Sequence, residues 1–193
     1  MKQIIKQLLN FVSIPILVIP ALMVISWLYL SDPRVFLKRW ALISGFLTII
    51  VPLGLLYYLR VKHRVADLDL TNKVQRLHYL RVLLPLYLLN YLVTVIFRAN
   101  LLIQAISLDL VVLLLVVWLI TERWKISLHM SAITALVTIA VVIEGAQAYF
   151  LILLIPALAL HRLLLKRHSI WQVLAGFGVG LLITRLSLMV YGF

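Results

Sequence analysis

The sequence contains no cysteine and few acidic residues. Asp and Glu number 6 among 193 residues, against 18 Lys and Arg. The absence of cysteine excludes disulfide bonds, thiolate nucleophiles and cysteine-ligated zinc. The loops offer few carboxylates, and no two histidines stand four residues apart, so a zinc site built on other ligands is not favoured either. We therefore expect neither a metal nor another cofactor.

Long apolar segments make up most of the chain. Hydrophobic residues account for 65% of it, and the mean hydropathy is +1.14, well above that of a soluble domain. A membrane-spanning helix needs about 20 apolar residues. Seven segments qualify, with six as the alternative because such boundaries are soft: Phe11–Leu30, Trp40–Leu59, Val82–Phe97, Leu101–Ile120, Ile126–Ile143, Ala146–Leu165 and Trp171–Tyr191.

These segments predict an all-α, polytopic transmembrane bundle of six to seven spans, with residues 1–193 forming a single membrane domain. The first segment is too long for a cleaved signal peptide and lacks a small-residue cleavage site, so we expect it to remain as an anchor. The only long polar connection covers residues 60–81. Its N-cap candidates predict a short surface helix that begins near Thr71.

Basic residues gather on one side of the predicted membrane. The side that receives the N-terminus and the connections 60–81, 121–125 and 161–170 has 13 Lys and Arg, against 5 elsewhere. The positive-inside rule places this side in the cytoplasm. Because the basic loops are short and lie at the membrane, we expect the bilayer and no nucleic acid as the partner. The prediction is an integral multi-pass protein of the plasma membrane.

The histidines follow the same distribution. All five lie in or beside the three basic connections, and none is in the middle of a span. Haem would require axial histidines on facing helices within the spans, so a haem protein is not indicated. A histidine at the membrane interface needs no function of its own, so the motifs around each histidine must indicate whether it has one. The five are His63, His78, His129, His161 and His168.

Two motifs carry most of the functional information. The segment "HRLLLKRHSIWQVLAG" places Arg162 six residues before His168, and "WKISLHMSA" places Ser127 and His129 at the start of a predicted span. They resemble the S-R-x5-H-x3-D and P-S-G-H motifs of the type 2 phosphatidic acid phosphatase superfamily. A looser counterpart of that family's K-x6-R-P motif is "DLDLTNKVQRLHYL". The resemblance covers roughly residues 60–182.

The resemblance implies hydrolysis of a lipid phosphate through a phosphohistidine. His168 would attack phosphorus, and His129 would protonate the leaving alcohol and later activate water. Such a site needs preorganised cations around the phosphate oxygens. The implied phosphate-binding residues are Arg162, Lys125, Ser127, Lys73 and Arg76.

The sequence departs from the family pattern at three positions. His161 replaces the usual Ser, and Leu128 replaces the Gly of P-S-G-H. Gln172 stands where the family has the Asp that orients the catalytic histidine. Gln172 can accept a hydrogen bond from the ring but brings no charge, and loss of the comparable carboxylate in another triad lowers turnover about 10⁴-fold. Gln172 also completes a capping box with Ser169, which offers a purely structural role.

Two functions therefore remain open. The first is a phosphoric monoester hydrolase, a membrane phosphatase that acts on a prenyl or glycerolipid phosphate. The second is a catalytically altered relative that binds or transports an anionic lipid with the same cations. Only the first requires both His129 and His168.

Polar and small residues within the spans suggest helix packing. Asn90 and Asp109 are equally far in sequence from the turn at residues 98–101, so we expect them to meet across a hairpin through an interhelical hydrogen bond. Gly176 and Gly180 form a G-x-x-x-G face that predicts close approach of another helix.

Overall fold

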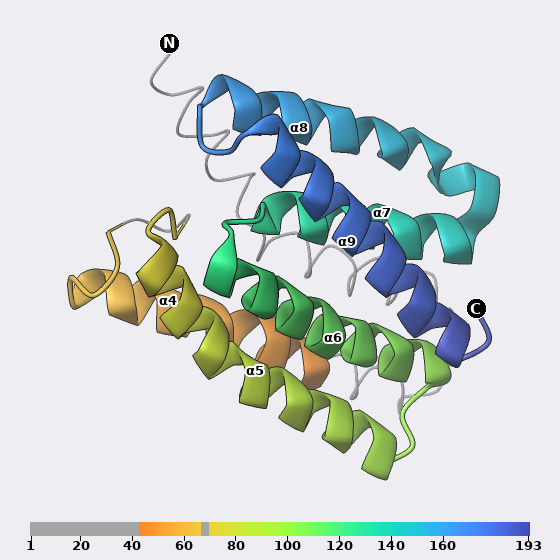
Figure 1. Ribbon diagram of the computed structural model, residues 1–193. Coiled ribbons are helices and arrows are strands. Elements are labelled where there is room, and N and C mark those ends of the chain that lie inside the picture. The colour runs from red at the N-terminus through yellow and green to blue at the C-terminus, as the bar shows by residue number, and fades with distance from the viewer. Residues whose placement is uncertain (1–42, 67–69) are drawn as a thin grey trace.

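A computed structural model describes residues 43–66 and 70–193 (Figure 1). The predicted span Phe11–Leu30 and the start of the span at Trp40 lie outside the described residues. Within them every regular element is a helix, as the all-α prediction requires. The elements are η1 (Phe46–Ile50, a π-helical turn), α4 (Val51–Val61), α5 (Lys73–Ile96), α6 (Leu101–Arg123), α7 (Leu128–Glu144), η2 (Gly145–Leu153, 3₁₀), α8 (Leu154–Leu164) and α9 (Ile170–Val190).

Five helical segments of the described chain are long and apolar enough to cross a membrane: Ile43–Val61, Lys73–Ile96, Leu101–Arg123, Leu128–Leu164 and Ile170–Val190. The chain is thus a multi-pass membrane protein. The fourth segment doubles back at Gly145, whose φ of +60° ends α7. Through η2 the chain returns alongside α7, so that α8 ends where α7 begins (Figure 1).

The start of α5 corrects one sequence prediction. The Asn72 side chain caps the helix by accepting hydrogen bonds from the N–H groups of Val74 and Gln75, at 2.9 and 3.2 Å. From this cap one helix of 24 residues continues through Pro85 to Ile96. The prediction of a separate short surface helix is therefore wrong, whereas the start of a helix near Thr71 is confirmed. The capped polar turn and the apolar segment belong to the same helix.

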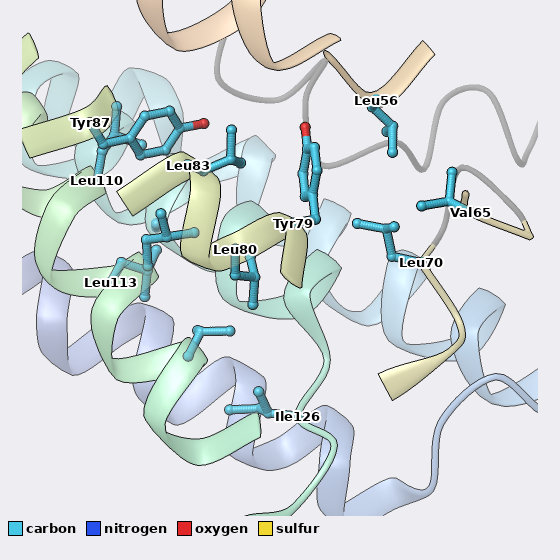
Figure 2. Close-up of a cluster of buried hydrophobic side chains, with 13 residues drawn as sticks. Leu56, Val65, Leu70, Tyr79, Leu80, Leu83, Tyr87, Leu110, Leu113 and Ile126 are labelled. Atoms are coloured by element: carbon cyan, nitrogen blue, oxygen red, sulfur yellow. The ribbon is translucent and has the colours of Figure 1, made fainter. Parts of the chain in front are cut away.

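Two tyrosines of α5 hold it against the helix before it in the chain. Pro52 has no N–H, so it cannot donate to the Thr48 carbonyl one turn earlier. The hydroxyl of Tyr87 donates to that carbonyl instead, at 3.3 Å, and the hydroxyl of Tyr79 donates to the carbonyl of Pro52 at 2.9 Å. Both rings lie in the apolar cluster of Figure 2, where Leu56 and Leu70 flank Tyr79. The proline is thereby accommodated inside a membrane helix.

Helix α6 lies between α5 and α9 (Figure 1). Its Ser107 accepts a hydrogen bond of 3.0 Å from the Asn90 amide of α5, and Asn90 in turn accepts one of 2.8 Å from Ser44. Asp109 instead faces the hydroxyl groups of Thr184 and Ser187 on α9. The predicted hydrogen bond between Asn90 and Asp109 is wrong. Ser107 and Asp109 are two residues apart on α6 and point to nearly opposite sides, so Ser107 faces Asn90 and Asp109 does not.

The G-x-x-x-G prediction is confirmed. Helix α9 packs on α7 so closely that a Cβ at Gly176 would lie 2.7 Å from the Ser127 carbonyl oxygen, and one at Gly180 would lie 2.5 Å from that of Ser131. Both neighbours are backbone atoms of α7 and its cap. The two glycines therefore set the distance between the helices that carry His129 and Gln172.

Candidate functional site

All three sequence motifs lie at the same end of the helical bundle. Helices α4, α6 and α8 end there, and α5, α7 and α9 begin there, on the left in Figure 1. Of the Lys and Arg residues that the structure describes, only Arg98 and Arg185 belong to the opposite end. The others are Arg60, Lys62, Arg64, Lys73, Arg76, Arg81, Arg123, Lys125, Arg162, Lys166 and Arg167. Two helices that run in opposite directions lie between consecutive motifs, α5 and α6 before the second and α7 and α8 before the third, so the chain returns to the same end each time.

His168 lies in the connection between α8 and α9 and is 6% exposed. Its Nδ1 atom is 3.0 Å from Oε1 of Gln172. The same Oε1 accepts a hydrogen bond of 3.2 Å from the Ser169 N–H, and the Ser169 hydroxyl accepts one of 3.4 Å from the Gln172 N–H. The predicted capping box is therefore present. Gln172 caps α9 and contacts the histidine at once.

This shared oxygen determines the tautomer of His168. A backbone N–H can only donate, so the Gln172 atom that faces Ser169 is the carbonyl oxygen, which can only accept. The Nδ1 atom of His168, which contacts that oxygen, must carry the proton. In the neutral ring Nε2 then holds the lone pair. The histidine is oriented with its basic nitrogen away from Gln172.

Three cations, from the first turn of α5, the connection between α6 and α7 and the last turn of α8, act on His168. Its pKa is lowered to about 3, first by burial and then by the positive charges of Arg76, Arg162 and Lys125, while the hydrogen bond to Gln172 acts in the opposite direction. The imidazole is therefore neutral near pH 7. Arg76 and Arg162 are both fully buried. Three of the five predicted phosphate-binding residues thus act electrostatically on the predicted nucleophile.

Arg76 also links two loops of the site. Its Nε donates to the Leu70 carbonyl at 3.0 Å, and one terminal nitrogen donates to the Ile126 carbonyl at 2.8 Å. Leu70 has φ +50° and lies in the connection before α5, whereas Ile126 lies between α6 and α7. The guanidinium group is held in place by these bonds, which preorganises its charge.

Ser127 connects the second and third motifs. Its N–H donates to the Gln172 main-chain carbonyl at 3.2 Å, and its hydroxyl caps α7 by accepting a hydrogen bond from the Met130 N–H at 3.5 Å. Both of these bonds are structural, and binding of phosphate by Ser127 stays a prediction. His129, in the first turn of α7, is 2% exposed. Ser127 thereby joins the helix of His129 to that of Gln172.

Lys73 points to a different place from the other predicted ligands. Its ammonium group donates to the Glu122 carbonyl at 2.8 Å and to the Arg123 carbonyl at 3.4 Å. These carbonyls are at the C-terminal end of α6, where a cation is favourable. Lys73 is not among the charges that act on His168. Its role as a phosphate ligand stays a prediction.

The backbone carbonyls that hold Arg76 cannot be predicted from residue types, because any residue can supply one. The pairing of Asp109 with Thr184 and Ser187 was also missed. A polar face of α9 at i and i+3 could have indicated it.

No family model matches the chain, and neither a curated protein nor a solved structure matches it.

Proposed function

We propose that the chain is a membrane lipid phosphate phosphatase that removes phosphate from a prenyl or glycerolipid phosphate. The observation that carries this proposal is the environment of His168, whose imidazole contacts Gln172 and is kept neutral by burial and by the charges of three cations. A neutral ring with a lone pair on Nε2 can act as a nucleophile, and the cations can stabilise the spread negative charge of a transferring phosphoryl group.

The reaction proceeds in two steps. Nε2 of His168 attacks phosphorus, the bond from phosphorus to the alcohol oxygen breaks, and protonated His129 gives its proton to that oxygen. Neutral His129 then takes a proton from water as the water attacks the phosphohistidine. Phosphate leaves and both histidines return to their starting states. Arg76, Arg162 and Lys125 hold the phosphoryl oxygens throughout, with the arginines able to bind two oxygens each.

The position of the site suits a lipid substrate. It lies at an end of the bundle, where the phosphate headgroup of a lipid would lie while its tail remains in the bilayer. We place this end in the cytoplasm of a plasma-membrane protein with six to seven spans, on the basic-residue bias.

One observation favours a second function. Gln172 contributes no charge, so the imidazolium that would form in the transition state has no carboxylate beside it. A site with the same cations that binds an anionic lipid without hydrolysing it is the alternative.

Purified protein in vesicles that contain phosphatidic acid or a prenyl phosphate tests the proposal. We expect phosphate release, and we expect His168→Ala and His129→Ala each to lower it by on the order of 10²-fold or more. His63→Ala and His161→Ala are the matched controls and should retain most of the activity. Binding of the lipid phosphate with no release by the wild type would favour the second function, and equal losses in all four variants would overturn the residue assignment.

A further inference from the structure

Arg81 lies at the N-terminal end of a row of exposed apolar residues on α5. Below it at helical spacing follow Leu88, Leu92 and Ile96, which are 44%, 45% and 69% exposed. Exposed apolar side chains at i, i+4 and i+8 mark a face turned toward lipid tails. Arg81 is itself exposed. A permanent positive charge therefore lies on the same side of α5 as these apolar residues, nearer to the end of the bundle that holds the candidate site.

Arg81 lies toward the same end of α5 as the candidate site. It lies five residues beyond the buried Arg76 of the candidate site, which is about 7.5 Å along the helix. The two arginines point to different sides of α5, since Arg76 is fully buried and Arg81 is exposed. Pro85 has no N–H to donate to the Arg81 carbonyl one turn earlier, which suits a hydrated depth better than the hydrocarbon interior.

The neighbouring helix supplies an aromatic platform. The guanidinium carbon of Arg81 lies 5.8 Å from the centre of the Trp118 ring on α6. Near this pair, Leu115 and Leu119 of α6 are 36% and 49% exposed, and Val82 of α5 is 43% exposed. In the described part of the chain, the contact of the guanidinium group is with this ring and not with a carboxylate. A cation over an aromatic face keeps its edge available for a hydrogen-bonding anion.

We propose that Arg81 and Trp118 form a lateral site for the phosphate group of an anionic bilayer lipid, on the outer surface between α5 and α6. The anion at this depth of a membrane is the headgroup phosphate, and a guanidinium fork binds two phosphate oxygens at once. Tryptophan at the membrane interface fixes the height of the helix pair. This site is separate from the one around His168 and does not depend on the proposed phosphatase activity.

Native mass spectrometry of the full-length protein, delipidated and then titrated with phosphatidylglycerol, tests the proposal. We expect Arg81→Ala to weaken retention of one lipid about 10-fold, equivalent to about 1.4 kcal/mol. Arg81→Lys, which keeps the charge but loses the fork, should give a smaller loss, and so should Trp118→Leu. The matched control is Arg185→Ala, which removes an exposed cation at the opposite end of the bundle.

Three results would overturn the proposal. The first is unchanged lipid retention by Arg81→Ala, provided that its thermal unfolding matches the wild type. The second is an equal loss in Arg185→Ala, which would indicate a general charge effect. The third is displacement of the lipid by inorganic phosphate, which would indicate a site for the free anion. His168→Ala should retain the lipid as the wild type does, so failure of the phosphatase proposal can be distinguished from failure of this one.

Discussion

One oxygen atom of Gln172 serves two neighbours, since it lies 3.0 Å from Nδ1 of His168 and 3.2 Å from the main-chain nitrogen of Ser169. The capping of α9 and the orientation of the histidine are therefore not alternatives. A carbonyl oxygen has two lone pairs, and each is used here. The start of the helix is the structural element that positions the ring.

Substitution of Gln172 tests this double role. Gln172→Glu keeps the length and both acceptor contacts and adds a negative charge beside the ring. The added charge should raise the pKa of His168 and stabilise the cation formed on attack, so we expect phosphate release to rise about 10-fold or more. Gln172→Asp should act in the same direction. Gln172→Leu should lower the rate, because nothing then fixes the tautomer.

The measurement is turnover with a saturating lipid phosphate in vesicles, together with thermal unfolding of each variant. A rate that stays at the wild-type level in Gln172→Glu, with only a small change in unfolding temperature, would show that the residue acts as a helix cap alone.

The lowered pKa of His168 predicts how stability depends on pH. The ordinary histidine pKa is about 6.5, whereas in the fold it is about 3. Between these values the unfolded chain binds more protons at this position than the folded chain, so stability contributed by the neutral ring is complete above about pH 6.5 and declines as the pH falls toward 3. Thermal unfolding of the wild type and of His168→Gln between pH 7 and pH 3 measures this. The wild type should lose more stability than the variant, and parallel curves would contradict the prediction.

Close packing of α9 on α7 predicts unequal effects for three glycines. An Ala Cβ at Gly176 would lie 2.7 Å from the Ser127 carbonyl oxygen, and one at Gly180 would lie 2.5 Å from that of Ser131, whereas nothing lies within 4 Å at Gly178. Because backbone atoms cannot rotate away, we expect Gly176→Ala and Gly180→Ala each to destabilise the protein by about 1–3 kcal/mol. Gly178→Ala is the control and should be neutral. Equal unfolding temperatures for all three would show that the helices are not in such close contact.

The sequence predicted much of this structure because the features are local or periodic. The Ser169–Gln172 capping box and the G-x-x-x-G face each depend on a few residues at fixed spacing, and both are present. The reversal at Gly145 falls between the predicted spans Ile126–Ile143 and Ala146–Leu165. Long-range placement was harder. The helices toward which α6 turns Ser107 and Asp109 depend on which helices flank it, and the pattern of one hairpin does not contain that information.

In the candidate site, too, local features could be predicted and long-range contacts could not. The choice of His168, Arg162 and Gln172 as candidates follows from the resemblance of one short segment to a family motif. The buried position of Arg76 could not be read from that spacing, because it depends on the carbonyls of Leu70 and Ile126 in two other loops. Lys73 and Arg76 are both candidates through the loose counterpart of the K-x6-R-P motif, yet the side chain of Lys73 reaches the end of α6. Three residues along a helix are enough to send two cations to different partners.

The last prediction is the side of the membrane on which the site lies. The chain has no native cysteine, so single cysteines can report exposure to water on one side. Val74, in the first turn of α5, is 74% exposed, and Ile170, at the start of α9, is 54% exposed. Both lie at the end that holds His168, and the positive-inside rule places that end in the cytoplasm. Gln147, an exposed residue of η2, belongs to the opposite end.

We expect an impermeant maleimide to label Gln147→Cys on intact cells, and to label Val74→Cys and Ile170→Cys only after the membrane is opened. Phosphate binding itself recruits cations, so the basic bias is partly a property of the site, and labelling is the independent measurement. Labelling of both Val74→Cys and Ile170→Cys on intact cells would place the site on the outer face. Labelling of only one of them would separate α5 from α9 and would overturn the shared site itself.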